Sequence, residues 1–76
     1  PIAYVGDTIA DIITVINARK EIPSQKFISI GLAPPHLHLR SRLKERNAYE
    51  TNLKKAGADI ILNSINDLKN INFKLF

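Results

Sequence analysis

Short apolar segments that alternate with helix-forming segments constrain the fold of this 76-residue chain more than any other feature. Residues 1–5 are apolar and β-prone, and Gly6 ends them, which is typical of a buried strand. Directly after it, four isoleucines recur at the i, i+3, i+4, i+7 spacing of one helical face: Ile9, Ile12, Ile13 and Ile16. We therefore expect a strand that leads into an amphipathic helix, with Asn17, Arg19 and Lys20 away from the apolar stripe.

The alternation continues along the rest of the chain. The expected segments are a strand at 27–32, an irregular stretch at 33–46, a helix at 47–56, a strand at 59–63 and a short helix at 65–70. Asn47 and Glu50 have the spacing of a capping box at the start of the second helix, and Gly57 provides its C-cap. Ser64, with Asp67 three residues later, is expected to cap the last helix.

The order β-α-β-α-β-α predicts an α/β fold with a short parallel sheet, because such alternation produces right-handed crossovers between parallel strands. A chain of this length buries only about 60% of the surface that it exposes when unfolded, so we expect one domain with a small core. The sequence has no cysteine, so neither a disulfide nor a thiolate metal site adds stability.

Charge and hydropathy limit the expected location and partners. No apolar run reaches the roughly 18 residues of a membrane span, and the lack of cysteine suits a reducing interior. We therefore expect a soluble, cytoplasmic protein with no membrane partner. Eleven Lys and Arg against seven Asp and Glu give a formal net charge of +4, which suits either a phosphate-bearing partner or an ordinary solvated surface.

Two carboxylates mark the point where the first strand passes into the first helix. Asp7 follows Gly6 directly, and Asp11 falls in the first helical turn. Ligands of open parallel sheets bind beyond the carboxyl ends of the strands, and Mg²⁺ prefers oxygen ligands and takes few of them from protein. Asp7 and Asp11 are therefore candidate Mg²⁺ ligands. The alternative is that both serve only the helix, through capping and its dipole.

Two segments resemble a known family. The first strand and helix, YVGDTIADIITVINA, resemble the fourth motif of haloacid dehalogenase (HAD) superfamily hydrolases, in which GDxxxD follows a strand. The later segment LKKAGADIILNSINDL resembles the turn, final strand and closing helix of these proteins, so that the two segments frame roughly residues 2–71. The resemblance implies a partial Rossmann-like, HAD-type three-layer sandwich. It also implies a Mg²⁺-dependent phosphatase that hydrolyses a phosphorylated small molecule through an aspartyl-phosphate.

The resemblance implies roles for particular residues. In this family an aspartate of an upstream strand attacks phosphorus, a second aspartate acts as acid and base, and a Ser/Thr and a Lys hold the phosphoryl group. The fourth motif supplies acidic cation ligands, which correspond here to Asp7 and Asp11. Thr8, between them, is a candidate contact for phosphate or substrate.

The chain departs from the family pattern because no DxD pair precedes Gly6. The other acids form no such pair either: Glu21, Glu45, Glu50, Asp59 and Asp67. We therefore expect residues 1–76 to be the C-terminal portion of a HAD-like core domain, with no catalytic residue of its own and no activity alone. A missing upstream half or a partner chain would supply the nucleophile. That half, or a second copy, would pair with the exposed edge of the first strand.

A basic stretch, RSRLKER, follows the second strand. Arg40 and Arg42 are candidates to bind the anionic group of a substrate, since guanidinium forks match phosphate oxygens. The alternative is a solvated connection whose basic side chains cover apolar surface. A second class of function is a non-catalytic module that binds RNA or another polyanion through residues 40–46. Nucleic acid is disfavoured, because no aromatic residue lies between Arg40 and Arg46 to stack on bases.

Four further side chains are assigned no primary role. His36 and His38 have the spacing that places both on one side of a strand, but they follow two prolines and have no cysteine or acid nearby, so no metal site is expected. Tyr4 and Tyr49 are expected to be packing residues.

Overall fold

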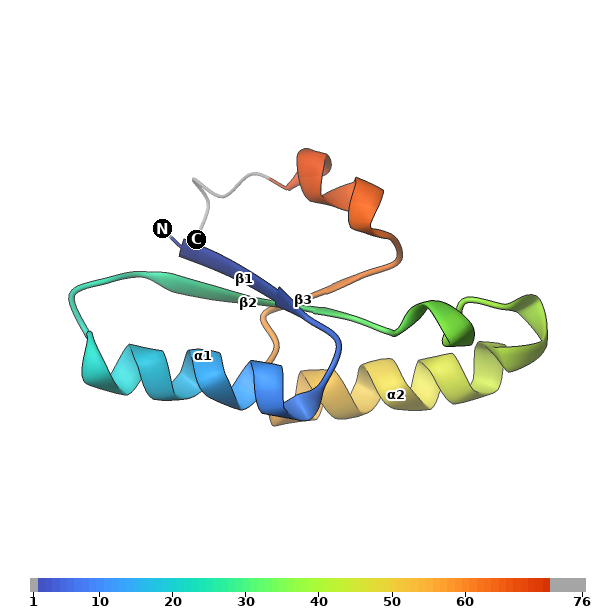
Figure 1. Cartoon of the computed structure of the whole chain (residues 1–76), viewed down its shortest axis with the longest axis horizontal. Coiled ribbons are helices and arrows are strands. Elements are labelled where there is room, and N and C mark those ends of the chain that lie inside the picture. Colours follow the sequence, from blue (N-terminus) through green and yellow to red (C-terminus); the bar gives the residue numbers. More distant parts are fainter. Residues whose placement is uncertain (1, 72–76) are drawn as a thin grey trace.

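The computed structural model describes residues 2–71 (Figure 1). Its strands and α-helices are β1 (Ile2–Gly6), α1 (Ile9–Glu21), β2 (Phe27–Leu32), α2 (Leu43–Ala56) and β3 (Ile60–Leu62). Three short 3₁₀ helices complete the described part of the chain: η1 (Pro35–Leu37), η2 (Arg40–Arg42) and η3 (Ile65–Asn70). The predicted alternation of strands and helices is confirmed.

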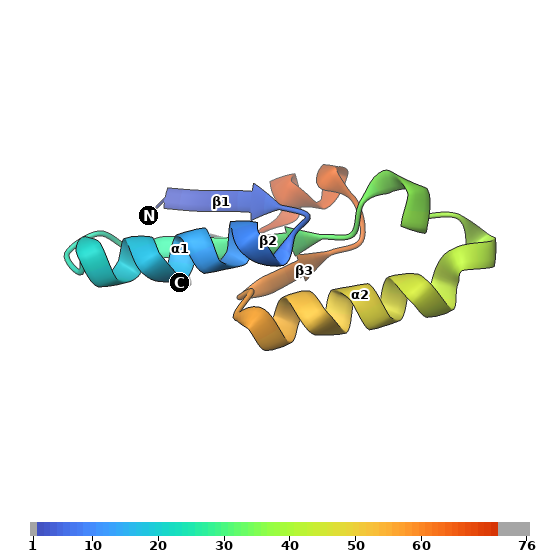
Figure 2. The same cartoon turned by 60° about the horizontal axis from the view of Figure 1, so that its bottom comes forward.

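The three strands form one parallel sheet in the order β1-β2-β3. Gly6 of β1 pairs with Gly31 of β2, and Ile30 of β2 pairs with Ile60 of β3. All three strands therefore present their carboxyl ends at the same edge of the sheet (Figure 2). The predicted α/β fold with a short parallel sheet is confirmed.

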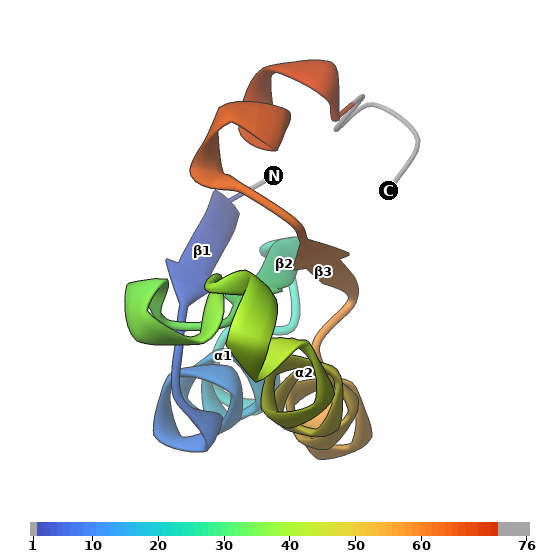
Figure 3. The same ribbon diagram turned by 90° about the vertical axis from the view of Figure 1, so that its right-hand side faces the viewer.

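The elements lie in three layers (Figure 3). Helices α1 and α2 cover one face of the sheet, and η3 lies over the other. The core has two parts: Ile12, Leu53 and Ala58 on the helix side, and Ile28, Ile30 and Leu62 on the side of η3. Leu68 and Ile71 pack against the second part, so the segment around η3 completes the opposite layer.

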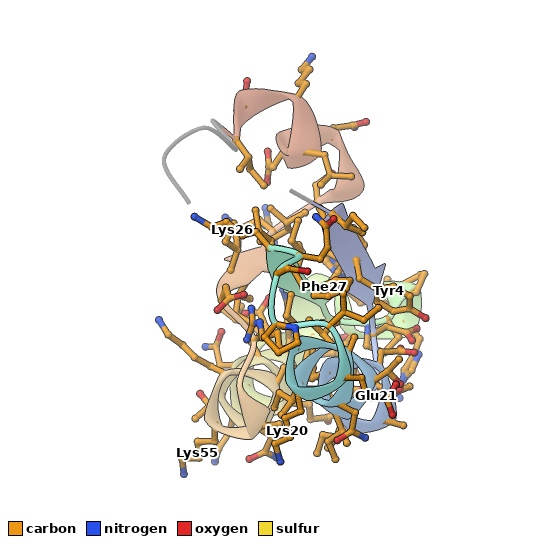
Figure 4. All side chains as sticks on the ribbon, turned by 90° about the vertical axis from the view of Figure 1, so that its left-hand side faces the viewer. Tyr4, Lys20, Glu21, Lys26, Phe27 and Lys55 are labelled. Carbon is orange, nitrogen blue, oxygen red and sulfur yellow. The ribbon has the colours of Figure 1, made fainter. Side chains whose placement is uncertain are left out.

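Strand β1 lies at one edge of the sheet and is mostly uncovered. Ile2 is 50% exposed and Tyr4 is 45% exposed, and Figure 4 shows Tyr4 on the outer side of β1. Among residues 2–71 no other strand pairs with its free side. The N–H and C=O groups that point away from β2 therefore form an open edge.

The buried face of α1 differs from the predicted isoleucine stripe. Ile12 and Val15 are fully buried and Ile16 packs against the helix-side core, whereas Ile9 is 47% exposed and Ile13 is 45% exposed. Both sets have helical spacing. The helix buries the set that faces the groove between the sheet and α2, so the prediction was wrong for Ile9 and Ile13.

Helix α2 begins four residues earlier than predicted. It starts at Leu43, so Asn47 lies inside the helix, where its carbonyl accepts a hydrogen bond from the Thr51 hydroxyl at 2.9 Å. The predicted Asn47–Glu50 capping box is therefore wrong. The residues from Leu43 to Arg46 are strong helix formers, and Arg46 pairs with Glu50 one turn later. The capping box of Ser64 with Asp67 at η3 is confirmed. None of the helices in the described part of the chain has the length and apolar character required to cross a bilayer.

A single carboxylate joins α1, β2 and the approach to β3. Asp59 Oδ2 accepts a hydrogen bond from Ser29 N at 2.8 Å and pairs with Arg19, and Asp59 N donates to Ser29 O at 2.9 Å. Arg19 also donates to Phe27 O at 2.9 Å. Arg19 was expected to lie away from the apolar side of α1. It is instead partly buried, because its guanidinium satisfies backbone groups at the start of β2.

We predict that Asp59→Ala lowers the free energy of unfolding by about 1.5–3 kcal/mol, since hydrogen bonds to a charged group have this value. Chemical denaturation would measure the change. Glu45→Ala is the matched control, because its pair with Arg42 is exposed on both sides; it should change the free energy by less than about 0.5 kcal/mol. Equal effects of the two substitutions would contradict the role of Asp59.

Candidate functional site

The corner between β1 and α1 is built around the carboxylate of Asp11. Its Oδ2 accepts three hydrogen bonds, from Asp7 N at 3.1 Å, Thr8 N at 3.1 Å and Thr8 Oγ1 at 2.9 Å. In return, Asp11 N donates to Thr8 Oγ1 at 3.2 Å. This reciprocal arrangement is a capping box, which satisfies amides that a helix start leaves without partners. The capping interpretation of Asp11 is thus confirmed.

This corner requires glycine at position 6, because any side chain there would clash with Asp11. A Cβ added to Gly6 would lie 2.3 Å from Asp11 Cβ and 2.7 Å from its Oδ2. The sequence indicated that Gly6 allows a tight turn and the close approach of a ligand. In the structure the group that approaches is the protein's own Asp11, and Gly6 has no positive φ.

Asp7 lies just beyond the carboxyl end of β1 and is exposed. Within residues 2–71, its hydrogen bonds use the backbone: its N–H donates to Asp11, and its carbonyl accepts from the Tyr49 hydroxyl. The carboxylate of Asp7 is therefore available to a ligand, and two neighbours hold its backbone in place.

Tyr49 comes from α2 and was expected only to pack. Its ring does pack against the helix-side core, but its hydroxyl also reaches the Asp7 carbonyl across 42 positions of sequence. Burial raises the pKa of the Tyr49 phenol, and the nearby carboxylates of Asp7 and Asp11 raise it further. Both charges disfavour a phenolate at this place.

The donor set fits a hard cation bound largely through water. Asp7 offers a free carboxylate, whereas Asp11 has one oxygen occupied by three donors, which leaves Oδ1. Mg²⁺ is usually bound by one or two carboxylates and keeps several waters. Within residues 2–71 no third His, Asp or Glu joins them in a group that could share one ion. Asp7 is thus the stronger candidate ligand, with Asp11 as a ligand through Oδ1 or through a bound water.

Thr8 lies at the same corner, but its hydroxyl is used by the helix cap. Its Oγ1 donates to Asp11 Oδ2 and accepts from Asp11 N. A phosphate contact by Thr8 remains a prediction, and it would require the hydroxyl to leave the carboxylate that it now caps.

Two arginines of the basic stretch, Arg40 and Arg42, are not brought to this corner. Arg42 precedes Tyr49 by seven residues, so its backbone lies about 10 Å further along the axis of α2. It pairs with Glu45 at 3.0 Å, and Arg40 is exposed in η2. A role for Arg40 and Arg42 in substrate binding therefore stays a prediction. It would require a substrate that extends well beyond Asp7.

Arg46, in contrast, connects two elements of the fold. It is largely buried between Glu50, which it meets at 3.1 Å, and Asn63, whose carbonyl and side chain accept at 3.2 and 3.3 Å. It therefore ties α2 to the segment after β3. Residues 40–46 were also interpreted as a solvated connection. This interpretation agrees with the exposed Arg40 but not with Arg46, which is largely buried.

The two histidines have different surroundings. His36 is exposed in η1, whereas His38 is partly buried and its Nε2 lies 2.7 Å from the carbonyl of Ala33. The His38 side chain thus helps to hold the backbone of the segment that follows β2.

The structure brings Asp7, Thr8, Asp11 and Tyr49 together and leaves Arg40 and Arg42 apart. Tyr49 was missed as a site residue because no local motif marks it. The one available signal was its position four residues before the buried Leu53, on the apolar face of α2. Comparison with models of protein families, with curated proteins and with solved structures finds no match to this chain.

We predict that Tyr49 titrates above the usual tyrosine pKa of about 10. The phenolate absorbance of a Tyr4→Phe protein reports on it alone, since the chain has two tyrosines. Asp7→Asn and Asp11→Asn should each lower the Tyr49 pKa without returning it to normal, because burial is the larger cause.

The raised pKa also predicts how stability depends on pH. A group whose pKa is higher in the folded state contributes stability below its unfolded pKa and loses it as the pH rises through the folded value. The free energy of unfolding should therefore fall above about pH 10, and less so in Tyr49→Phe. A Tyr49 that ionises at the value of a free peptide would contradict this account.

Proposed function

We propose that this chain is the Mg²⁺-binding C-terminal part of a HAD-like phosphatase, with a partial Rossmann-like fold. The observation that carries the proposal is the position of Asp7: an exposed carboxylate directly beyond the carboxyl end of a parallel strand, beside the first turn of α1. This is the edge at which open α/β sheets bind ligands. The GDxxxD spacing places the second carboxylate, Asp11, within hydrogen-bond distance of the same loop.

The residues of the corner would act either as ligands of the cation or as supports of the loop that carries them. Asp7 offers its carboxylate to the cation. Asp11 fixes the amides of Asp7 and Thr8, and Tyr49 fixes the carbonyl of Asp7, so that the loop keeps one conformation. When bound, Mg²⁺ would neutralise negative charge on a phosphoryl group. A fixed conformation of this loop matters because a displaced Asp7 would weaken the affinity for the cation and misalign the phosphoryl group.

The nucleophile would come from outside residues 1–76, from an upstream segment or a partner chain. The supporting observation is the open edge of β1, where a further strand would find unpaired backbone groups beside the Asp7 corner. A strand added there would end next to Asp7. The substrate would then be a phosphorylated small molecule held between the two parts.

We predict that Asp7→Asn weakens Mg²⁺ binding by about 100-fold and Asp11→Asn by about tenfold, because outer partners of a metal cost less than direct ligands. Isothermal titration and the amide shifts of residues 6–11 would measure both. Asp67→Asn is the matched control, since Asp67 holds the same position in the capping box of η3. Equal Mg²⁺ affinities of Asp7→Asn and the unchanged chain would refute the metal site.

We also predict that the 76-residue chain alone does not hydrolyse an aryl phosphate, with or without Mg²⁺. It has a candidate cation site but no assigned nucleophile, and a cation alone does not hold a phosphoryl group in line for attack. Release of the aryl alcohol would be followed by absorbance. Steady turnover by the pure chain that disappears in Asp7→Asn would show that the nucleophile lies within these residues.

A further inference from the structure

A pocket lies at the same edge of the sheet as Asp7. It is a cavity of about 260 Å³, open to solvent, that we call the β2–β3 pocket; it is lined by Leu32, Ala33, Pro35, His38 and Ser64. These residues belong to β2 and to the two segments that follow β2 and β3. Both segments leave the sheet at its carboxyl end (Figure 2).

His38 is one of two polar side chains among the residues that line this pocket. Its Nε2 lies 2.7 Å from the carbonyl oxygen of Ala33. A carbonyl only accepts, so Nε2 carries the proton, and in the neutral ring Nδ1 is left as an acceptor. The ring is partly buried and held to the backbone of the strand end.

Ser64 provides the second polar group. Its Oγ accepts a hydrogen bond from Asn66 N at 3.2 Å as the cap of η3. That bond uses a lone pair of the oxygen, so the hydroxyl proton remains available to a ligand. Of the lining residues, His38 thus keeps one acceptor and Ser64 keeps one donor.

The rest of the lining is apolar: Leu32, Ala33 and Pro35. Among the described residues, no Asp, Glu, Lys or Arg lines the pocket, so a charged group would lose water there without gaining an oppositely charged partner. The volume equals that of about nine waters at roughly 30 Å³ each, which is room for one substituted ring. The matching occupant is an uncharged, mainly apolar group that ends in a hydroxyl or an amide.

The pocket and the Asp7 corner lie at the same edge of the sheet. Gly6 pairs with Gly31 on the adjacent strand; Asp7 directly follows Gly6, and Leu32, which lines the pocket, directly follows Gly31. We propose that the β2–β3 pocket binds the uncharged organic part of the substrate while its phosphoryl group lies at Asp7. The substrate class is then the phosphate ester of a small, mainly apolar alcohol that also carries a second hydroxyl or an amide. The position of the phosphoryl group rests on the proposed function, but binding in the pocket does not.

Benzyl alcohol tests the pocket without phosphate or metal. Titrated into the 76-residue chain, it should shift the amide signals of Leu32, Ala33, His38 and Ser64. His38→Gln should weaken binding about three- to tenfold, the value of one hydrogen bond. His36→Gln is the matched control, because this exposed histidine lies outside the lining, and it should change affinity less than about twofold.

A second variant separates loss of binding from loss of fold. Ala33→Leu fills the pocket and should abolish the shifts, and its amide spectrum shows whether the sheet is intact. If Ala33→Leu unfolds the chain, the His38→Gln and His36→Gln pair decides the question. Shifts spread over the whole surface, or equal effects of the two histidine variants, would overturn the pocket.

The monophosphate of benzene-1,4-dimethanol with Mg²⁺ then connects the two sites, because it keeps one free hydroxyl for His38 or Ser64. It should bind more tightly than benzene-1,4-dimethanol itself in the unchanged chain, and Asp7→Asn should remove that gain while the pocket shifts remain. If the alcohol binds but Asp7→Asn changes nothing, the pocket stands and the metal corner fails. If Mg²⁺ binding depends on Asp7 but neither compound reaches the pocket, only the pocket proposal fails.

Discussion

The burial of β2 on both faces is the constraint on which the rest of the structure depends. Its isoleucines, Ile28 and Ile30, face the layer of η3, while Ser29 and Gly31 leave room for the helices. A Cβ on Gly31 would lie 2.9 Å from Ile61 and 3.2 Å from Leu53, so α2 and β3 come as close as a glycine allows. A strand enclosed in this way must satisfy its backbone from within the protein. The neighbouring strands do so along its length, and Arg19 and Asp59 do so at its start.

The candidate site shows how structural and functional demands compete for the same atoms. The turn that places Asp7 beyond β1 needs a cap, and the cap takes the Thr8 hydroxyl and one oxygen of Asp11. What remains for a ligand is the carboxylate of Asp7 and the second oxygen of Asp11. Of the two acidic residues of the motif, Asp7 thus has a carboxylate available to a ligand, whereas Asp11 mainly fixes the conformation of the loop. The tyrosine from α2 adds a support that no local motif requires.

Local rules predicted the parts of the fold that depend on neighbours in sequence. Gly57 ends α2 with a φ of 121°, Ser64 with Asp67 caps η3, and the strand order along the chain is as expected. The rest depended on contacts that the sequence does not display. On α1, the predicted isoleucines and the buried set of Ile12, Val15 and Ile16 both have helical spacing, and the packing of α1 against the sheet and α2 decides which side chains are buried. The link from Tyr49 to Asp7 joins residues 42 positions apart, so no local pattern reveals it.

The sheet has two outer strands among the described residues, β1 and β3, and this has a consequence for assembly symmetry. If β1 of one molecule pairs with β1 of another, a two-fold axis relates them and growth stops at two copies. If β1 pairs instead with β3 of the next molecule, each addition leaves a fresh edge and the result is an open filament. β1 carries no charged side chain from Ile2 to Gly6 to discourage either outcome. An added strand that covers β1 would remove β1 from both of these pairings.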